Sequence, residues 1–185
     1  HCMIRPRSGG FSYCEADLAQ MLHDIDMARD LGLAGVVFGA LTDEGALDSH
    51  VLQRVSRHAA GLDLTLHRAF DCCGPDFDRA VDTAIELGFD RVLTSGGEKT
   101  ALEGLNALER IFTKAGNRIT IMPGSGISAA NVEKLLSRLQ ITEVHSSCSK
   151  PVSMAHRLDA NLGFIQEGRR ETNPVFVRVL KRALV

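Results

Sequence analysis

Four short runs of apolar, β-favouring residues recur through the middle of the chain and decide its fold. They read Ala34-Gly-Val-Val-Phe-Gly39, Leu62-Asp-Leu-Thr-Leu66, Asp90-Arg-Val-Leu-Thr94 and Arg118-Ile-Thr-Ile-Met122. Their first residues are 34, 62, 90 and 118, a constant step of 28. A similar run, Thr142-Glu-Val-His-Ser146, follows them, and Cys2-Met-Ile-Arg5 precedes them. The spacing predicts six β-strands.

The segments between these runs have the patterns of helices. Leu18, Met21, Leu22, Ile25 and Ala28 fall at the spacing of an apolar helix stripe. Further helices are predicted over residues 48–60, 75–87, 100–115, 128–139 and 172–184, with glycines suited to end several of them at 32, 88 and 116. Alternating strands and helices predict βαβ units and a parallel sheet.

A near-constant repeat favours a closed TIM-type (β/α)8 barrel, because every unit of a barrel is equivalent. An open doubly wound sheet is the alternative, although no Gly-x-Gly-x-x-Gly follows the first strand. The length predicts a single domain over residues 1–185. Because such barrels typically take about 250 residues, we expect a barrel that lacks its first β/α unit. No last strand is legible over residues 147–172.

The composition excludes several classes of function. The chain is 44% hydrophobic and 24% charged, and 21 basic residues against 23 acidic ones give a net charge of −2. A chain with this net charge has no positive electrostatic field that would attract nucleic acid or anionic membranes. With neither a membrane-length apolar run nor a signal-peptide pattern, a cytoplasmic location is expected. Five cysteines without regular spacing predict reduced thiols.

Polar residues follow the predicted strands, where the ligand sites of parallel α/β folds lie. Their side chains and turns are expected to meet at one barrel mouth. The candidate ligand-binding residues are Arg5, Arg7, Arg68, Ser95, Gly96, Gly124, Gly126 and His145, and the candidate catalytic residues are His67 and Asp71.

These residues suit an enzyme that acts on a small anionic or phosphorylated compound. Arg5 and Arg7 would clamp the anion, His67 would act as general acid or base, and Asp71 would orient it. Ser95 and the glycine turn over residues 124–126 would hold the distal group. Each also has a structural alternative: the arginines as rim ion pairs, His67 as a packed strand residue, Asp71 as a helix cap and the glycines as tight turns.

No set of metal ligands stands out from the sequence. Cys72 and Cys73 are adjacent, so their side chains tend to diverge, and neither Cys-x-x-Cys nor His-x-x-x-His occurs. Cys148 follows His145 by three residues, and thiolate with imidazole suits Cu(I) or zinc. A free buried cysteine is the alternative.

Seven motifs in order along the chain resemble the copper homeostasis protein CutC family. They are Met3-Ile-Arg-Pro-Arg7, Val37-Phe-Gly-Ala-Leu-Thr42, His67-Arg-Ala-Phe-Asp71, Arg91-Val-Leu-Thr-Ser-Gly96, Ala101-Leu-Glu-Gly-Leu105, Ile121-Met-Pro-Gly124 and Glu143-Val-His-Ser146. The resemblance implies a TIM-barrel-like fold, a homo-oligomer, and a cytoplasmic location with the nucleus as a second compartment. It also implies copper as the bound ion, with a role in copper trafficking or tolerance.

The chain departs from the family pattern in three places. Family members carry a strand and helix ahead of the Ile-Arg-Pro-Arg motif, with cysteines that are candidates for copper binding, and this segment is not in the sequence. Ser8-Gly-Gly-Phe11 stands where the family has Gly-Gly-Asp-Phe, so a carboxylate at the mouth is lost. Ser125 stands within a turn where glycine throughout is usual.

Three hypotheses for the function follow. By resemblance, the chain is a copper homeostasis protein that binds Cu(I) or acts indirectly. From its residues, it is a barrel enzyme for a small anionic metabolite. As a third reading, it is an inactive fragment whose open barrel edge needs a partner chain.

Overall fold

The centre of the molecule is a parallel sheet, as the strand spacing predicted. The computed structural model describes residues 1–74, 76–152 and 168–184. Neighbouring strands of the sheet are also consecutive in the chain, with β1 and β5 at its edges, and all of them pair in parallel. The strands are β1 (Cys2–Met3), β2 (Gly35–Phe38), β3 (Asp63–Leu66), β4 (Arg91–Thr94) and β5 (Thr120–Pro123). The alternation with helices confirms the (β/α) barrel class, here as a partial barrel.

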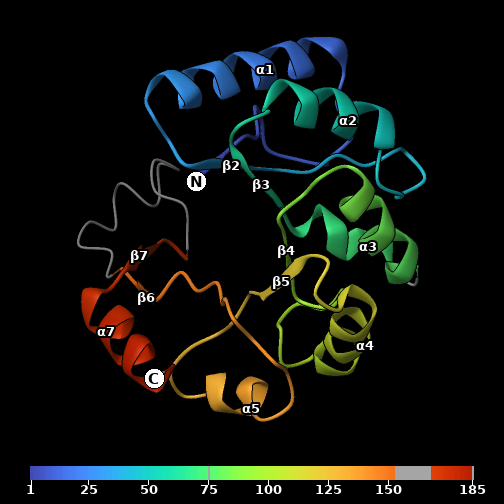
Figure 1. Cartoon of the computed structure of the whole chain (residues 1–185). Coiled ribbons are helices and arrows are strands. Elements are labelled where there is room, and N and C mark those ends of the chain that lie inside the picture. The colour runs from blue at the N-terminus through green and yellow to red at the C-terminus, as the bar shows by residue number, and fades with distance from the viewer. Residues whose placement is uncertain (75, 153–167, 185) are drawn as a thin grey trace.

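Helices alternate with the strands and lie outside them (Figure 1). They are α1 (Glu15–Asp30), α2 (Ser49–His58), the 3-10 helix η1 (Arg68–Cys73), α3 (Phe77–Glu86), α4 (Leu105–Ala115) and α5 (Val132–Leu136). The predicted apolar stripe of α1 buries Leu18, Met21, Ile25 and Ala28. Gly32 and Gly88 have φ of 68° and 77°, which confirms left-handed glycines after α1 and α3.

Successive side chains of β3 point to opposite faces of the sheet. Leu64 and Leu66 belong to the main hydrophobic core beneath the helices. The Thr65 side chain points to the opposite face of the sheet, and its hydroxyl accepts a hydrogen bond from Arg91 at 3.2 Å. His67 follows β3 in the same alternation as Thr65. The sequence pattern therefore placed His67 on the face opposite the leucines, and the structure agrees.

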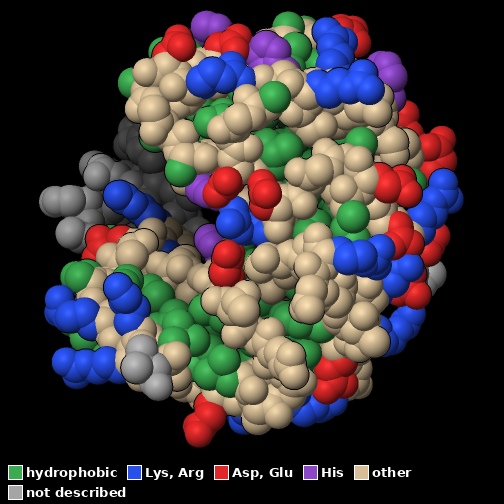
Figure 2. Space-filling view, in the orientation of Figure 1, with side chains coloured by type: hydrophobic (Ala, Val, Ile, Leu, Met, Phe, Trp, Pro, Cys, Tyr) green, Lys and Arg blue, Asp and Glu red, His purple; other side chains and the backbone are tan. Residues whose placement is uncertain are grey.

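Charged side chains meet where the strands begin. His1 pairs with Asp63 at 3.5 Å, and Arg91 pairs with Glu143 at 2.9 Å. Figure 2 shows basic, acidic and histidine side chains gathered around a hollow on this view of the molecule, close to the place where Figure 1 marks the N-terminus. These ion pairs link the beginnings of the strands to the segment that follows α5.

The prediction of a strand over residues 142–146 was wrong. This segment is irregular, and one described backbone hydrogen bond, from His145 N–H to the Pro123 carbonyl at 2.9 Å, joins it to β5. Its side chains are held elsewhere, since Glu143 pairs with Arg91 and the Ser146 hydroxyl donates to the Ile127 carbonyl at 2.6 Å. The predicted helix over residues 128–139 is likewise shorter and is limited to α5.

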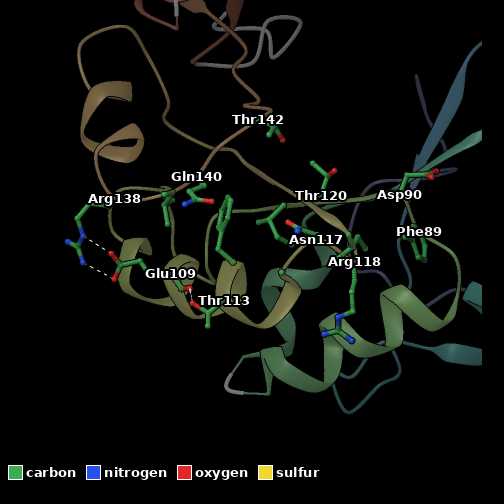
Figure 3. Close-up of a pocket in the computed structure, with 15 residues that line it drawn as sticks. Phe89, Asp90, Glu109, Thr113, Asn117, Arg118, Thr120, Arg138, Gln140 and Thr142 are labelled. Atoms are coloured by element: carbon green, nitrogen blue, oxygen red, sulfur yellow. Dashed lines mark hydrogen bonds and ion pairs between the residues drawn. The ribbon is translucent and has the colours of Figure 1, made fainter.

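A cavity of about 810 Å³ lies where the chain diverges from β5 (Figure 3). Thr120 lines it from β5, and Gln140 and Thr142 line it from the diverging segment. The ion pair of Arg138 with Glu109, at 2.6 Å, lies at one side of it. Arg118, which also lines the cavity, pairs with Asp82 at 3.3 Å, and Asp90 accepts a hydrogen bond from Leu64 N–H at 2.7 Å.

The last part of the chain contains two strands that the sequence pattern did not predict. They are β6 (Ser149–Pro151) and β7 (Arg170–Thr172), which pair antiparallel. The predicted final helix is present as α7 (Pro174–Ala183), and the Asn173 side chain caps it by accepting from Val175 N–H at 2.8 Å. Among the helices that the structure describes, none has the length and apolar character of a membrane span. Pro75, the first residue of the predicted helix over residues 75–87, lies outside the described residues.

Candidate functional site

His67 lies directly after β3 and is almost fully buried, with 3% of its surface exposed. Its Nδ1 accepts a hydrogen bond from the Ala69 backbone N–H at 3.1 Å. In a neutral imidazole one nitrogen accepts and the other carries the proton, so the proton of His67 is on Nε2. That Nε2 is buried and has no hydrogen-bond partner among the described residues.

The space for the imidazole ring comes from a glycine on the neighbouring strand. Phe38 pairs with Leu66, so the residues that follow, Gly39 and His67, are also side by side. A Cβ at Gly39 would lie 2.6 Å from Nδ1 of His67, which is closer than any real contact. The ring of Phe11 packs on the other side, with its centroid 4.9 Å from that of His67.

The buried position sets the charge of His67. Burial disfavours the charged imidazolium and lowers the pKa of His67 to about 4, and the positive charge of Arg5 acts in the same direction. At neutral pH the ring is therefore uncharged, and Nε2–H is available as a hydrogen-bond donor.

Arg5 and Arg7 have different roles at the end of β1. Arg5 donates to the Gly9 carbonyl at 2.5 Å, and its guanidinium lies 4.8 Å from the centre of the Phe11 ring. Arg7 pairs with Asp17 at 2.9 Å and donates to the Ser12 carbonyl. Arg7 thus fixes the loop between β1 and α1, whereas Arg5 lies beside the two rings of the candidate site.

Tyr13 belongs to the same loop, and the sequence reasoning did not select it. Its hydroxyl is buried and has no hydrogen bond of normal geometry to a described residue. Burial raises the pKa of Tyr13, while the nearby charges of Arg5 and Arg7 and the approach of an Arg5 N–H to the hydroxyl oxygen lower it. The position just after the Met-Ile-Arg-Pro-Arg motif was the signal that could have indicated this residue.

Thr42 is a third residue with an unpartnered buried oxygen, within the part of the chain that is described. Its segment is joined to the Phe11 loop by two hydrogen bonds. Leu41 N–H donates to the Phe11 carbonyl at 2.9 Å, and the Ser12 hydroxyl donates to Asp43 at 2.8 Å. The segment after β2 that holds Thr42 is therefore joined to the Phe11 loop, and the Phe11 ring packs on His67 after β3.

Asp71 is engaged with β4 rather than with His67. Its carboxylate accepts from Arg68 Nε at 2.7 Å, Thr94 Oγ1 at 2.5 Å and the backbone N–H groups of Ser95 and Gly97 at 3.0 Å, and also from the Ser95 hydroxyl. The described hydrogen bonds of Asp71 do not include His67. The predicted unit of a histidine oriented by this carboxylate is therefore not the arrangement in the structure.

Arg68 and Ser95 complete this second cluster. One Arg68 nitrogen donates to the Ser95 hydroxyl at 2.7 Å and to the Glu98 carbonyl at 2.9 Å. The loop after β4 begins with Gly96 at φ 73°, where an added Cβ would lie 2.5 Å from the Gly104 carbonyl oxygen. The structure brings Arg68, Asp71 and Ser95 together, and their hydrogen bonds are already made within the protein.

The glycine turn after β5 lies against the β4 loop. An added Cβ at Gly124 would lie 2.4 Å from Leu93 Cδ1 and 3.4 Å from His145 Cβ, and one at Gly126 would lie 3.0 Å from Thr100 Cγ2. Ser125 has φ 78°, and its hydroxyl donates to the Lys99 carbonyl at 2.7 Å. These glycines allow close packing, the structural alternative that the sequence left open.

The cysteines do not form an evident metal centre. All five are free thiols. Burial raises the pKa of Cys73 to about 11, which disfavours the thiolate that binds metals. Cys148 is bonded to Ser146 through its backbone N–H at 3.2 Å. Over residues 1–74, 76–152 and 168–184, no group of three or more His, Cys, Asp or Glu side chains is placed to hold a metal ion.

Comparisons with known proteins agree with the motif pattern. A model of the CutC family matches residues 1–150. A CutC family protein of Rhizobium meliloti is 50% identical over 184 residues, which is 100% of this chain and 75% of the relative. A CutC family protein of Caulobacter vibrioides is 44% identical over 185 residues, covering 98% of this chain and 75% of the relative.

Solved structures confirm the fold. The crystal structure of a CutC protein from Streptococcus agalactiae, whose proposed role is copper homeostasis, is 32% identical and has a TM-score of 0.74 over 77% of this chain and 70% of that one. An aldolase is 15% identical with a TM-score of 0.58 over 77% of this chain and 66% of its own, a likeness of fold alone. From the family match and the level of identity, the chain belongs to the CutC family.

Proposed function

We propose that this chain binds a small anionic ligand where β1 and β3 end, with Arg5 as the cation and His67 as a neutral hydrogen-bond donor. The observation that carries the proposal is the buried Nε2–H of His67, which has no partner among the described residues. A buried donor without a partner costs about 1–3 kcal/mol, so such a group calls for an acceptor that the protein does not itself provide.

The charge near this donor favours an anionic acceptor. Arg5 has five guanidinium N–H groups, and one of its nitrogens is used on the Gly9 carbonyl. The remaining donors can bind an oxyanion, and guanidinium suits carboxylates and phosphates particularly well. With Arg7 holding the loop, the proposed anion clamp is reduced to Arg5 together with His67.

The tautomer of His67 supports polarisation of an oxygen rather than removal of a proton. Nδ1 accepts from Ala69 and Nε2 carries the proton, so no free lone pair faces a ligand. A neutral imidazole with a lowered pKa can stabilise negative charge that develops on a carbonyl or phosphoryl oxygen. If the site catalyses a reaction, we therefore assign His67 the role of donor.

We further propose that any contribution of the chain to copper homeostasis runs through this ligand site and not through a thiolate cluster. The family name and the S. agalactiae protein supply the link to copper, and the dispersed thiols of the described residues support an indirect role. Anaerobic Cu(I) titration of the wild type and of a variant with all five cysteines replaced should give the same binding. A thiol-dependent Cu(I) site would contradict this part of the proposal.

Calorimetric titration at neutral pH tests the anion site, with inorganic phosphate and propionate as probes. We expect one of them to bind, and we expect Arg5→Ala and His67→Ala each to weaken it about tenfold or more, because each removes a buried or charged partner. Arg110→Ala, an exposed arginine on α4, is the matched control and should leave binding unchanged. Absence of binding, or affinity unaffected by both site variants, would overturn the proposal.

A further inference from the structure

We infer that the ligand carries an uncharged hydroxyl or carbonyl oxygen beside its anionic group, and that the Tyr13 hydroxyl binds this oxygen. The ligand class is then a hydroxylated or keto carboxylate, or a phosphate ester with a neighbouring hydroxyl, rather than a simple anion. The inference rests on the proposed anion site and adds a residue that sets its specificity.

The first step is that Tyr13 and His67 both lie beside Arg5. The guanidinium of Arg5 lies on the Phe11 ring, and the same ring contacts His67. The Arg5 side chain also approaches the Tyr13 hydroxyl, and its charge lowers the pKa of both Tyr13 and His67. An anion held by Arg5 would therefore have the phenol and the imidazole as neighbours.

The second step concerns the charges of these groups. Burial raises the pKa of Tyr13 and lowers that of His67, so at neutral pH both groups are uncharged and each has one hydrogen to donate. Arg5 is thus the single positive charge among the three. One anionic group matches that charge, and the two neutral donors are suited to further oxygens that carry no full charge.

The third step is that the leftover polar atoms come from different elements of the mouth. Tyr13 belongs to the loop after β1, Thr42 follows β2 and His67 follows β3, and each has a buried polar atom without a partner in the described chain. Buried polar atoms without a partner are few in folded proteins, and each calls for an explanation. Three from consecutive βα loops, of which two lie beside one arginine, point to a ligand with several oxygens.

Access to His67 requires a local movement. Because Nε2 is buried, a ligand must displace a neighbouring group, and the Phe11 ring lies against the imidazole. Phe11 follows Gly9 and Gly10, and Gly9 has a φ of 96°. An anion that replaced the Gly9 carbonyl on Arg5 would release this loop at the same time, because that carbonyl is the partner of Arg5.

The chain offers a direct probe, because Tyr13 is its only tyrosine and it has no tryptophan. We would titrate two matched pairs, propionate with lactate and propyl phosphate with glycerol 3-phosphate, by calorimetry and by tyrosine absorbance. The hydroxylated member of at least one pair should bind roughly 3- to 10-fold tighter, and it alone should perturb the tyrosine band. Tyr13→Phe, which removes only the hydroxyl, should abolish this preference.

Thr113→Val, a hydroxyl deletion on the exposed side of α4, is the control and should keep the preference. Equal binding of both members in the wild type, or a preference that persists in Tyr13→Phe, overturns this inference. If binding in those cases still weakens in Arg5→Ala, the proposed anion site stands without it. If no probe binds, the anion site itself is wrong and the inference falls with it.

Discussion

His67 and Asp71 are four residues apart at the end of the same strand, yet their surroundings differ completely. Asp71 accepts hydrogen bonds from five donor groups, and four of these bonds link η1 to β4 and its loop. The imidazole of His67 makes one hydrogen bond, from Ala69 N–H to Nδ1, and its other nitrogen is buried without a described partner. The comparison teaches that hydrogen-bonding capacity left over in a buried group, rather than the residue type, separates a candidate ligand site from a structural joint.

The difference follows from what each neighbouring strand presents. Thr94, Ser95 and Gly97 after β4 offer a hydroxyl and backbone N–H groups that converge on the Asp71 carboxylate. Gly39 after β2 offers only space, and the Phe11 ring offers no acceptor in its plane. Around Asp71 the hydrogen-bonding groups are therefore paired with one another, whereas Nε2–H of His67 lacks an acceptor among the described residues.

The largest loss of stability is expected from substitution of Asp71, whose hydrogen bonds are all made within the protein. Asp71→Ala removes an acceptor whose side chain is 8% exposed and leaves Arg68 and several N–H groups without their partner. We expect a loss of about 3–5 kcal/mol in the free energy of unfolding, measured by urea denaturation. Glu86→Ala, at an exposed helix position, should cost less than about 0.5 kcal/mol. A loss of similar size in both variants would show that Asp71 does not hold this joint.

The pH dependence of the free energy of unfolding tests whether His67 is buried as a neutral ring. The pKa of His67 is about 4 in the folded chain against an ordinary 6.5, so between these values the unfolded chain binds a proton that the folded chain does not. The free energy of unfolding should therefore fall as the pH drops from 6.5 towards 4, by up to about 3 kcal/mol from this residue. His67→Gln should lack that part of the slope. Identical slopes in variant and wild type would mean that His67 is not buried as a neutral ring.

The space beside His67 is expected to be sensitive to a single methyl group. Gly39→Ala places a Cβ within 2.6 Å of Nδ1 and 3.1 Å of the Ala69 Cβ. We expect a loss of about 1–3 kcal/mol in stability, since the ring has to shift. Gly10→Ala is the matched substitution, because no atom lies within 4 Å of its Cβ. If the two variants unfold at the same denaturant concentration, the ring has room that the structure does not show.

Two deletions of a hydroxyl group give the finest comparison. Thr94→Val removes a fully buried hydroxyl that donates to Asp71 at 2.5 Å and accepts from Gly96 N–H at 2.9 Å, so we expect a loss of about 1–2 kcal/mol. Tyr13→Phe removes a hydroxyl without a described partner, so without ligand its effect should be near zero or slightly stabilising. Thermal melts at the same pH compare them. A clear loss in Tyr13→Phe would reveal a partner for its hydroxyl.

The local sequence pattern predicted much of the fold. The step of 28 residues located β2, β3, β4 and β5, and the apolar stripe located α1. The pattern failed at residues 142–146, because a run of β-favouring residues forms a strand only where it runs alongside the edge strand and makes the ladder of hydrogen bonds with it. Here Glu143 and Ser146 are instead held by Arg91 and by the Ile127 carbonyl. The pattern also missed β6 and β7, whose short polar sequences carry little apolar alternation.

The sequence by itself determined the elements that are encoded locally: strand and helix periods, glycine stops, and the placing of His67, Arg5 and Asp71 at strand ends. Only the tertiary structure decided which of these groups have partners. Beyond its local pair with Arg68, Asp71 is bonded by residues 23 to 26 positions further along the chain. In contrast, one buried polar atom each of Tyr13, Thr42 and His67 has no partner among the described residues. Burial and hydrogen bonding depend on contacts between distant segments. A sequence pattern specifies the face of a helix or strand on which a side chain lies, but not which groups pack against that face.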